Sequence, residues 1–247
     1  MRALIAAEIA SNWEGSISKA KKLIKECKNA GADAVKFQMW RALDLYKDNH
    51  PEWNIIKKSE LTFEKARELK IYSDEVGIEF FCSGFYPEAI EFLDSIKVKR
   101  HKIASRTCTL KDPHSLETIT KISDYKKPVV ISMGMGGDRK RIEKIFSNNK
   151  KIFCYCISEY PTKIDKIDWK NAMKYDGFSD HTLGITAPLI FAMLKKQQNA
   201  KNIFIEKHVK LKNSQGPDAS SSIDTDELSE LVRHVRQIEK ISIKDLV

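Results

Sequence analysis

Short apolar runs of strand length alternate along this chain with longer amphipathic stretches of helix length. Several runs are apolar on both faces, as strands are when helices cover a parallel sheet. We count eight runs and expect strands at residues 3–10, 34–38, 79–85, 101–104, 128–133, 151–157, 177–179 and 202–208. Because such alternation is typical of parallel β/α units, the pattern predicts an α/β fold: a (β/α)8 TIM barrel, formed as a single domain by residues 1–247.

The stretches between the runs carry helix start and stop signals. Residues 16–30 place small and apolar side chains at helical spacing and stop at Gly31, as a C-cap should. Further helices are expected over residues 62–76, 113–121 and 138–145, and from Asp224 or Thr225 onward. Residues 40–59 and 162–175 show little periodicity, and we expect them to be loops with short helical turns over the catalytic face.

Length and composition fit one enzyme domain. The 247 residues are a usual size for an eight-fold barrel and suffice to bury a large core. No apolar run has membrane length, and Glu8 interrupts the first apolar segment too early for a signal peptide. Five cysteines, without the spacing of a disulfide framework, favour a reducing compartment and core thiols. We therefore expect a cytoplasmic protein with no membrane partner.

The formal net charge of +9 raises the question of a nucleic-acid partner. The lysines, however, are spread over many expected helices, and no basic stripe alternates with exposed aromatic residues as single-strand binders require. We expect a solvated lysine-rich surface and no nucleic acid, with the positive field helping to attract an anionic substrate.

Two histidines stand where expected strands end. His181 follows the seventh run and His208 closes the eighth, so one strand-helix repeat separates two nitrogen donors. We expect them to bind a metal, with Asp180 and Glu206 as outer partners of the imidazoles. Two protein ligands would leave open positions for water and substrate oxygens, which suits Lewis acid catalysis. The alternative is that each histidine fills a polar niche beneath a loop.

Lys36 and Lys102 lie within apolar strands, where an unpaired charge would be costly. We expect them to bind an anion, and the alternative is a buried salt bridge with Glu8 or Asp33. Strand-end serines can add hydroxyl donors to a phosphate or carboxylate, or merely cap the next helix. These serines are Ser105, Ser132 and Ser179.

Three further residues are candidates for proton transfer or substrate contact. Glu8 ends the first strand among apolar neighbours, which would raise its pKa unless a nearby lysine neutralises it. Asp218 lies in a turn after the eighth strand and either positions a substrate hydroxyl or shapes that turn. Tyr160 either lines the acceptor pocket or packs the loop before Pro161.

Taken in order, the motifs resemble the sialic acid synthase family over essentially the whole chain. The motifs are residues 7–9 with Asn12 and Gly15, 31–38, 81–83, 102–105, 158–161, 179–184, 206–208 and 216–218. The resemblance implies the barrel of that family, a divalent metal, usually Mn²⁺ or Mg²⁺, and use of phosphoenolpyruvate. By that resemblance the enol carbon attacks the aldehyde of an open-chain N-acylhexosamine, water adds, and phosphate leaves to give a nine-carbon 2-keto acid.

The resemblance also assigns expected roles to individual residues. His181 and His208 would hold the metal that polarises the aldehyde. The phosphate and carboxylate of phosphoenolpyruvate would be bound by Lys36, Lys102, Ser105, Ser132 and Ser179. The groups expected to face the sugar or the attacking water are Glu8, Asp218 and Tyr160, with Asn12 as a further substrate contact.

The chain departs from the family on the acceptor side. Trp13 and Ala219 stand where members usually have histidine, Arg106 and Thr107 replace Gly-Glu, and Met133 replaces a threonine. The family's C-terminal antifreeze-like domain has no counterpart in these residues. Arg106 is a candidate for the cation that this domain would otherwise lend to the substrate. A homodimer through other faces, or a separate antifreeze-like partner, is compatible with these departures.

The leading hypothesis is a phosphoenolpyruvate- and metal-dependent synthase that makes a nonulosonic or related 3-deoxy-2-keto acid from an altered aldose. One alternative is a catalytically degenerate barrel that binds a sugar phosphate or serves as a partner-dependent subunit. Another is a metal-dependent aldolase or isomerase, which would ignore phosphoenolpyruvate.

Overall fold

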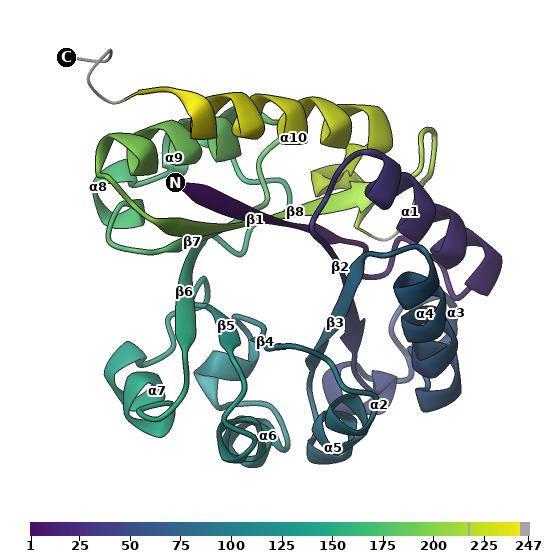
Figure 1. Ribbon diagram of the computed structural model, residues 1–247. Helices are drawn as coiled ribbons and strands as arrows, with labels where there is room; N and C mark the ends of the chain where they lie inside the picture. Colours follow the sequence, from purple (N-terminus) through teal and green to yellow (C-terminus); the bar gives the residue numbers. More distant parts are fainter. Residues whose placement is uncertain (217, 243–247) are drawn as a thin grey trace.

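The computed structural model describes residues 1–216 and 218–242 and confirms the expected barrel. Eight parallel strands follow one another around a ring, and β1 closes it by pairing along its whole length with β8 (Figure 1). They are β1 Arg2–Glu8, β2 Ala34–Met39, β3 Glu79–Gly84, β4 His101–Ile103, β5 Val129–Ser132, β6 Lys151–Cys156, β7 Gly177–Asp180 and β8 Asn202–Lys210. A short strand β9, Ile223–Asp224, pairs with the end of β8.

Helices surround the ring of strands, and α10 packs against α9, α1 and β1 (Figure 1). The α-helices are α1 Ile17–Asn29, α2 Ala42–Leu45, α3 Trp53–Lys58, α4 Phe63–Glu75, α5 Pro87–Ser95, α6 Ser115–Asp124, α7 Arg139–Ile145, α8 Trp169–Ala172, α9 Thr186–Gln197 and α10 Thr225–Lys240. Three 3-10 turns complete the connections: η1 Thr107–Thr109, η2 Ile164–Lys166 and η3 Ala219–Ser221.

Local signals in the sequence account for the helix ends. The Ser16 hydroxyl accepts a hydrogen bond from the Lys19 amide at the start of α1, and Gly31, with φ +85°, follows its end. Asp224 and Glu227 form a capping box at the start of α10. The two stretches expected to be loops with short turns contain only α2, α3, η2 and α8, so that prediction is confirmed.

All eight expected strands are present, with ends that differ by at most two residues. The first was expected to reach Ala10 but ends at Glu8, and Ala10 has a left-handed backbone with φ 45°. The eighth was expected to end at His208 but continues to Lys210, because β9 pairs with its last residues. Residues 217 and 243–247, which belong to the expected domain and include part of the motif at 216–218, lie outside the described residues.

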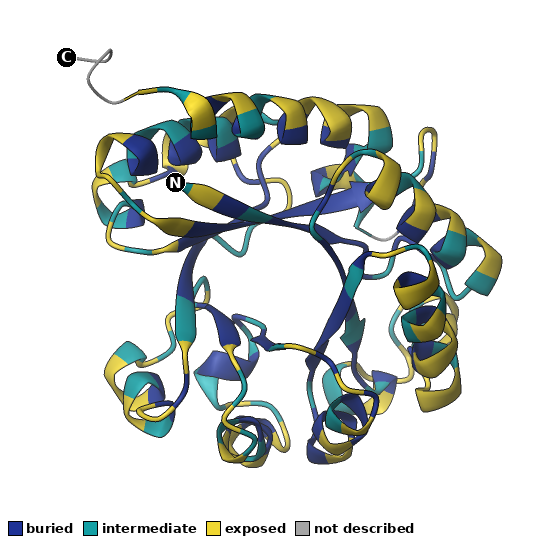
Figure 2. Ribbon diagram, viewed as in Figure 1, coloured by how far each residue is buried: buried dark blue, intermediate teal, exposed yellow. Residues whose placement is uncertain are grey.

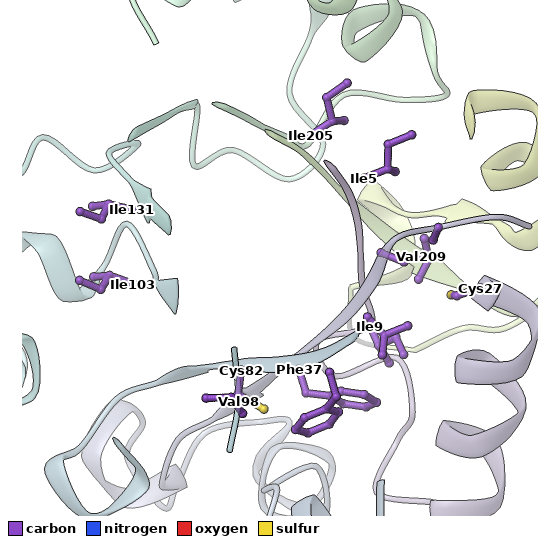
Figure 3. Close-up of a cluster of buried hydrophobic side chains, with 14 of the residues drawn as sticks. Ile5, Ile9, Cys27, Phe37, Cys82, Val98, Ile103, Ile131, Ile205 and Val209 are labelled. Carbon is purple, nitrogen blue, oxygen red and sulfur yellow. The ribbon is translucent and has the colours of Figure 1, made fainter. Parts of the chain in front are cut away.

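The larger core lies between the strands and the helices. Strand side chains alternate between the two faces of the sheet, and apolar side chains that face the helices form much of this core. Figure 3 shows some of them. Examples are Ile5, Phe37, Ile103, Ile131 and Ile205. Buried residues of the helices lie on the side toward this layer, and exposed residues lie on the outer side (Figure 2).

A second, smaller core fills the N-terminal half of the barrel interior. We call it the lower lumen layer, and it consists of Ala6, Ala34, Phe81, Val130, Cys154 and Phe204. The large rings of Phe81 and Phe204 occupy space that small neighbours leave, as packed barrel interiors require. Two residues further along the same strands, the same face carries the upper lumen layer: Glu8, Lys36, Ser83, Ser132, Cys156 and Glu206. The interior therefore changes from apolar to charged along the barrel axis.

The five cysteines are all buried and free of disulfides, as expected for core thiols. No helix in the described part of the chain is long and apolar enough to cross a membrane.

Candidate active site

A cavity of about 430 Å³ opens above the upper lumen layer, at the C-terminal ends of the strands. This is the end of a β/α barrel at which catalytic residues are found. Most of the residues singled out in the sequence line it: Lys36, Lys102, Ser105, Arg106, Ser132, Tyr160, Ser179, His181, His208 and Asp218. The structure thus brings together side chains from most strands of the barrel, although 182 residues separate Lys36 from Asp218 in the sequence.

Two buried lysines and a carboxylate form the floor of the cavity. Lys36 Nζ lies 3.8 Å and Lys102 Nζ 3.6 Å from the carboxylate of Glu206. Burial alone would raise the pKa of Glu206, but the two ammonium groups and a hydrogen bond from Ser179 outweigh it and lower that pKa. Glu206 is therefore an anion that holds two cations beside the cavity.

The serines complete this floor. Lys102 Nζ donates to Ser132 Oγ at 2.7 Å, and Ser179 Oγ donates to Glu206 at 2.8 Å. Ser105 Oγ accepts a hydrogen bond from the amide of Gly134 at 2.9 Å. A Cβ at Gly134 would lie 2.7 Å from Ser158 Oγ, so only glycine allows this approach. Hydroxyls and ammonium groups together can bind an anion with several oxygens.

Glu8 does not line the cavity. Its side chain is fully buried, forms an ion pair with Lys36 and accepts a hydrogen bond from Gln38 Nε2 at 3.1 Å. This corrects the expectation that Glu8 faces the sugar, and it matches the alternative in which Lys36 pairs with Glu8. Asp33, the other partner considered for Lys36, pairs with Arg2 and Arg236 instead. Burial raises the pKa of Glu8 to about 7, although Lys36 opposes the shift.

The two histidines converge across the cavity. Their ring centroids lie 5.3 Å apart with 56° between the planes. His181 Nδ1 donates to the carbonyl of Ile157 at 2.6 Å, which leaves Nε2 as the free nitrogen. His208 Nδ1 is buried and has no hydrogen-bond partner among the described residues. Burial, reinforced by the nearby ammonium groups of Lys36, Lys207 and Lys102, holds the pKa of His208 well below its usual range, so the imidazole is neutral.

These residues fit a divalent cation. Neutral imidazole is the form that binds metals, and a backbone carbonyl fixes the His181 tautomer as partners of metal-binding histidines do. Within residues 1–216 and 218–242, no group of three or more His, Cys, Asp and Glu side chains could hold a metal. The protein would therefore supply two ligands, and water or substrate oxygens would supply the rest.

Asp180 and Glu206 were expected as partners of the imidazoles, but neither carboxylate forms a hydrogen bond with a histidine in the described chain. Asp180 pairs with Lys207, and Glu206 pairs with Lys36 and Lys102. The carbonyl of Ile157 takes the role expected of Asp180. Every residue has a backbone carbonyl, so the residue type at position 157 could not reveal that this carbonyl accepts the bond.

The loops above the histidines form the opposite wall. The Tyr160 ring packs 4.1 Å from that of His181, and Asp218 accepts a hydrogen bond from the Ser11 amide at 2.9 Å. Burial raises the pKa of Asp218. Arg106 reaches the cavity while Asp112 holds its guanidinium through two hydrogen bonds of 2.6 and 2.9 Å. The outer wall thus presents a phenol, a carboxyl group and an oriented cation.

Two residues from the first loop stay away from the cavity. Asn12 is fully buried and donates to the Val209 carbonyl on β8 and to Ser222 Oγ, so it joins the first loop to these segments rather than lining the site. Trp13, at the position of a usual family histidine, belongs to the core between strands and helices. The expectation that Asn12 contacts substrate is therefore corrected.

Sequence reasoning left out several lining residues. Gln38 and Cys156 line the cavity, and Cys156 Sγ lies 3.9 Å from His181 Nδ1. Both stand two residues after a lumen-facing position on their strand, so strict alternation along each expected strand would have found them. Ser158 and Ser220 lie on loops, where no such rule applies.

Comparisons with known proteins show the family to which the chain is similar. A family model described as the NeuB family matches residues 23–245. An uncharacterized protein of Methanocaldococcus jannaschii is 35% identical over 96% of this chain and 71% of its own length. The N,N'-diacetyllegionaminic acid synthase of Legionella pneumophila is 30% identical over 98% of this chain and 73% of its own length.

A solved structure shows the same architecture. The N-acetylneuraminic acid synthetase of Leptospira borgpetersenii, crystallised with citrate, superposes with a TM-score of 0.85 at 27% identity. The match covers 97% of this chain and 85% of that one.

Proposed function

The chain belongs to the NeuB family of carbon-carbon bond-forming synthases, and we propose that it condenses phosphoenolpyruvate with an N-acylhexosamine-like aldose. The product would be a nonulosonic or related 3-deoxy-2-keto acid, with release of phosphate. The observation that carries this proposal is the shared cavity, in which two ammonium groups and three hydroxyls lie beside two converging imidazoles. Five free cysteines support a cytoplasmic location as part of the same proposal.

The floor of the cavity is the proposed donor site. Lys36 and Lys102 bind the phosphate and carboxylate of phosphoenolpyruvate, and Ser105, Ser132 and Ser179 add hydroxyl donors. Glu206 keeps both ammonium groups in place before the substrate arrives, because it lies within 4 Å of each. Preorganised charge of this kind spares the reorganisation that water would require.

His181 and His208 would hold the divalent cation, Mn²⁺ or Mg²⁺. When bound, the cation supplies Lewis acidity toward the aldehyde oxygen of the acceptor. The protein's own part is to fix the two imidazoles, as the bond from His181 to Ile157 does, and to keep His208 neutral.

The outer wall is the proposed acceptor site. The methylene carbon of phosphoenolpyruvate forms a bond with the aldehyde carbon, and the aldehyde oxygen takes a proton and becomes a hydroxyl. Water then adds at the former enol carbon, and phosphate departs with the bridging oxygen to leave a ketone. In this proposal Asp218, whose pKa burial raises, accepts or donates a proton of that water, and Tyr160 and Arg106, which also line the cavity, contact the sugar.

Phosphate release tests the proposal. The protein is incubated with Mn²⁺, phosphoenolpyruvate and a panel of N-acylhexosamines, and phosphate and 2-keto acid are measured. We expect both products in equal amounts, and only when an aldose is present. If no sugar of a broad panel yields phosphate or 2-keto acid, although the protein binds Mn²⁺ and phosphoenolpyruvate, the result would favour the degenerate barrel. Conversion of a sugar that proceeds without phosphoenolpyruvate would favour an aldolase or isomerase.

A metal-binding measurement tests the ligand assignment separately. His208→Ala is expected to abolish Mn²⁺ binding in calorimetry while leaving the unfolding free energy close to that of wild type. A strand-end side chain at a cavity contributes little to the core, which is why we expect the fold to tolerate its loss. The matched control is His234→Ala on α10, which should leave the Mn²⁺ affinity unchanged. Equal affinity in His208→Ala and wild type would remove His208 from the metal site.

A further inference from the structure

A buried ion pair lies behind the two converging histidines, on the other face of the barrel wall. Asp180 on β7 and Lys207 on β8 are register partners, and each immediately precedes a histidine of the cavity. Lys207 Nζ lies 2.6 Å from Asp180 Oδ2, and the two side chains are 0% and 1% exposed. Because side chains alternate along a strand, this pair faces the helices while Ser179, Glu206 and His208 face the lumen.

The pair also holds the chain just beyond β7. Asp180 accepts hydrogen bonds from the Thr182 amide at 2.9 Å and from the Thr182 hydroxyl at 3.1 Å. Lys207 Nζ donates to the Thr182 carbonyl. Three polar groups of Thr182 are therefore fixed by two charged side chains, and His181 lies between Thr182 and Asp180.

His181 is held from its other side as well. Its carbonyl accepts a hydrogen bond from the Thr162 amide at 2.9 Å, and its Nδ1 donates to the Ile157 carbonyl at 2.6 Å. His208 directly follows Lys207 on an adjacent strand. The ion pair therefore joins the backbone that carries one imidazole to the backbone that carries the other.

Stability alone does not account for such a pair. A buried ion pair is often no more stabilising than apolar side chains of similar volume, because both charges lose their hydration. Apolar replacements, however, could not reproduce the directional bonds to Thr182. What the charged pair adds is a fixed position for the segment that begins at His181.

We propose that Asp180 and Lys207 are positioning residues that set the placement of the His181 and His208 imidazoles relative to each other. This inference rests on the proposed metal-binding role of the two histidines. The pair contacts neither the cavity nor a substrate and acts through the backbone of residues 180–182 and 207–208. Outer partners of metal ligands commonly change metal affinity by about 10–100-fold when they are removed.

The test replaces both charges at once, so that no unpaired charge is left buried. In the double variant Asp180→Leu with Lys207→Met, we expect cooperative unfolding but Mn²⁺ binding weaker by about 10–100-fold in calorimetry. We also expect faster amide hydrogen exchange at residues 181–183. The matched control is Glu79→Leu with Arg100→Met, which removes a two-bond ion pair at the N-terminal ends of β3 and β4. That control should leave the Mn²⁺ affinity and the exchange at 181–183 unchanged.

A folded double variant with wild-type Mn²⁺ affinity and wild-type exchange at 181–183 would overturn the inference. If the double variant does not fold, Thr182→Val carries the test, because it removes only the hydroxyl that donates to Asp180. We expect Thr182→Val to weaken Mn²⁺ binding by about threefold or more, which is less than the loss expected for the double variant. Unchanged Mn²⁺ affinity in Thr182→Val would again overturn the inference. A wild-type protein that binds no Mn²⁺ would contradict the metal proposal instead, and the exchange at 181–183 would then decide the inference.

Discussion

The two layers of the barrel interior use the same strands for different purposes. In the lower lumen layer, Phe81 and Phe204 pack with small apolar side chains. Two residues later on those strands, Ser83 and Glu206 take part in a network of buried charges. Side chains that stabilise the barrel and side chains of the charged layer at the cavity are therefore only two residues apart on each strand.

The difference shows how a barrel accommodates buried charge. Lys36, Lys102 and Glu206 are each less than 4% exposed, yet each ionised group lies within 4 Å of an opposite charge. The lower layer fills the interior beneath them, and the cavity lies at the C-terminal ends of the strands. Loss of a lower-layer side chain should therefore cost stability, whereas loss of an upper-layer charge should cost activity.

The largest effect is expected from Phe204→Ala in the lower layer. The ring is fully buried, and large-to-small substitutions of this kind lower the unfolding free energy by about 3–5 kcal/mol. Chemical denaturation of the variant measures that loss, and Phe63→Ala, at a half-exposed ring on α4, is the matched control. A loss below about 1 kcal/mol would mean that the lower layer does not stabilise the barrel as buried cores do.

The next effect concerns the upper layer. Lys102→Met should lower kcat/KM for phosphoenolpyruvate by about 10²–10³-fold, because a preorganised donor to a charged substrate is lost. The variant should fold, since the long apolar stem is replaced by one of similar volume. Steady-state kinetics with denaturation measures both, and Lys99→Met, an exposed lysine before β4, is the control. A variant that loses unfolding free energy but keeps wild-type kcat/KM per folded molecule would reverse the division between the layers.

The sequence predicted much of this division, and its failures have a physical cause. The eight runs located every strand of the barrel but not the short β9. Lys36 and Lys102, expected to bind an anion, and His208, expected to bind a metal, line one cavity. Sequence reasoning gave the Glu8–Lys36 pair beneath the cavity only as an alternative, because choosing between the possible partners of Lys36 needs the register between β1 and β2. Asn12 was misplaced for a similar reason, since its partners Val209 and Ser222 come from the far end of the chain. Contacts of this kind join residues that are far apart in the sequence, so local sequence patterns do not predict them.

A smaller effect is expected from a buried polar side chain that faces away from the lumen. His101 precedes Lys102 on β4, is buried, and has both ring nitrogens without hydrogen-bond partners among the described residues. Burial, with a smaller contribution from Lys127, lowers its pKa to about 4. The unfolded chain therefore takes up this proton at a higher pH than the folded protein, from about 6.5 downward. The contribution of His101 is fully present above that pH and is lost as the pH falls toward 4.

His101→Phe should remove this dependence. Relative to its own value at pH 7, the variant should lose about 2 kcal/mol less unfolding free energy at pH 5 than wild type does. Denaturation at the two pH values measures the difference, and His234→Phe, at a partly exposed position on α10, is the control. Turnover per folded molecule should not change. An identical pH dependence in His101→Phe and wild type would show that the buried ring does not titrate as described.

The smallest effect separates the floor of the cavity from its outer wall. Arg106 is 38% exposed and Asp112 holds it through two hydrogen bonds, so it presents a cation without belonging to the lysine network. In Arg106→Ala we expect the KM for the aldose to rise about tenfold, or about 1.4 kcal/mol, while the KM for phosphoenolpyruvate stays unchanged. The KM of Arg106→Lys for the aldose should lie between those of wild type and Arg106→Ala, because lysine keeps the charge but loses the two paired hydrogen bonds to Asp112. An unchanged KM for the aldose would exclude Arg106 from the acceptor site, and an equal rise for both substrates would place it with the floor instead.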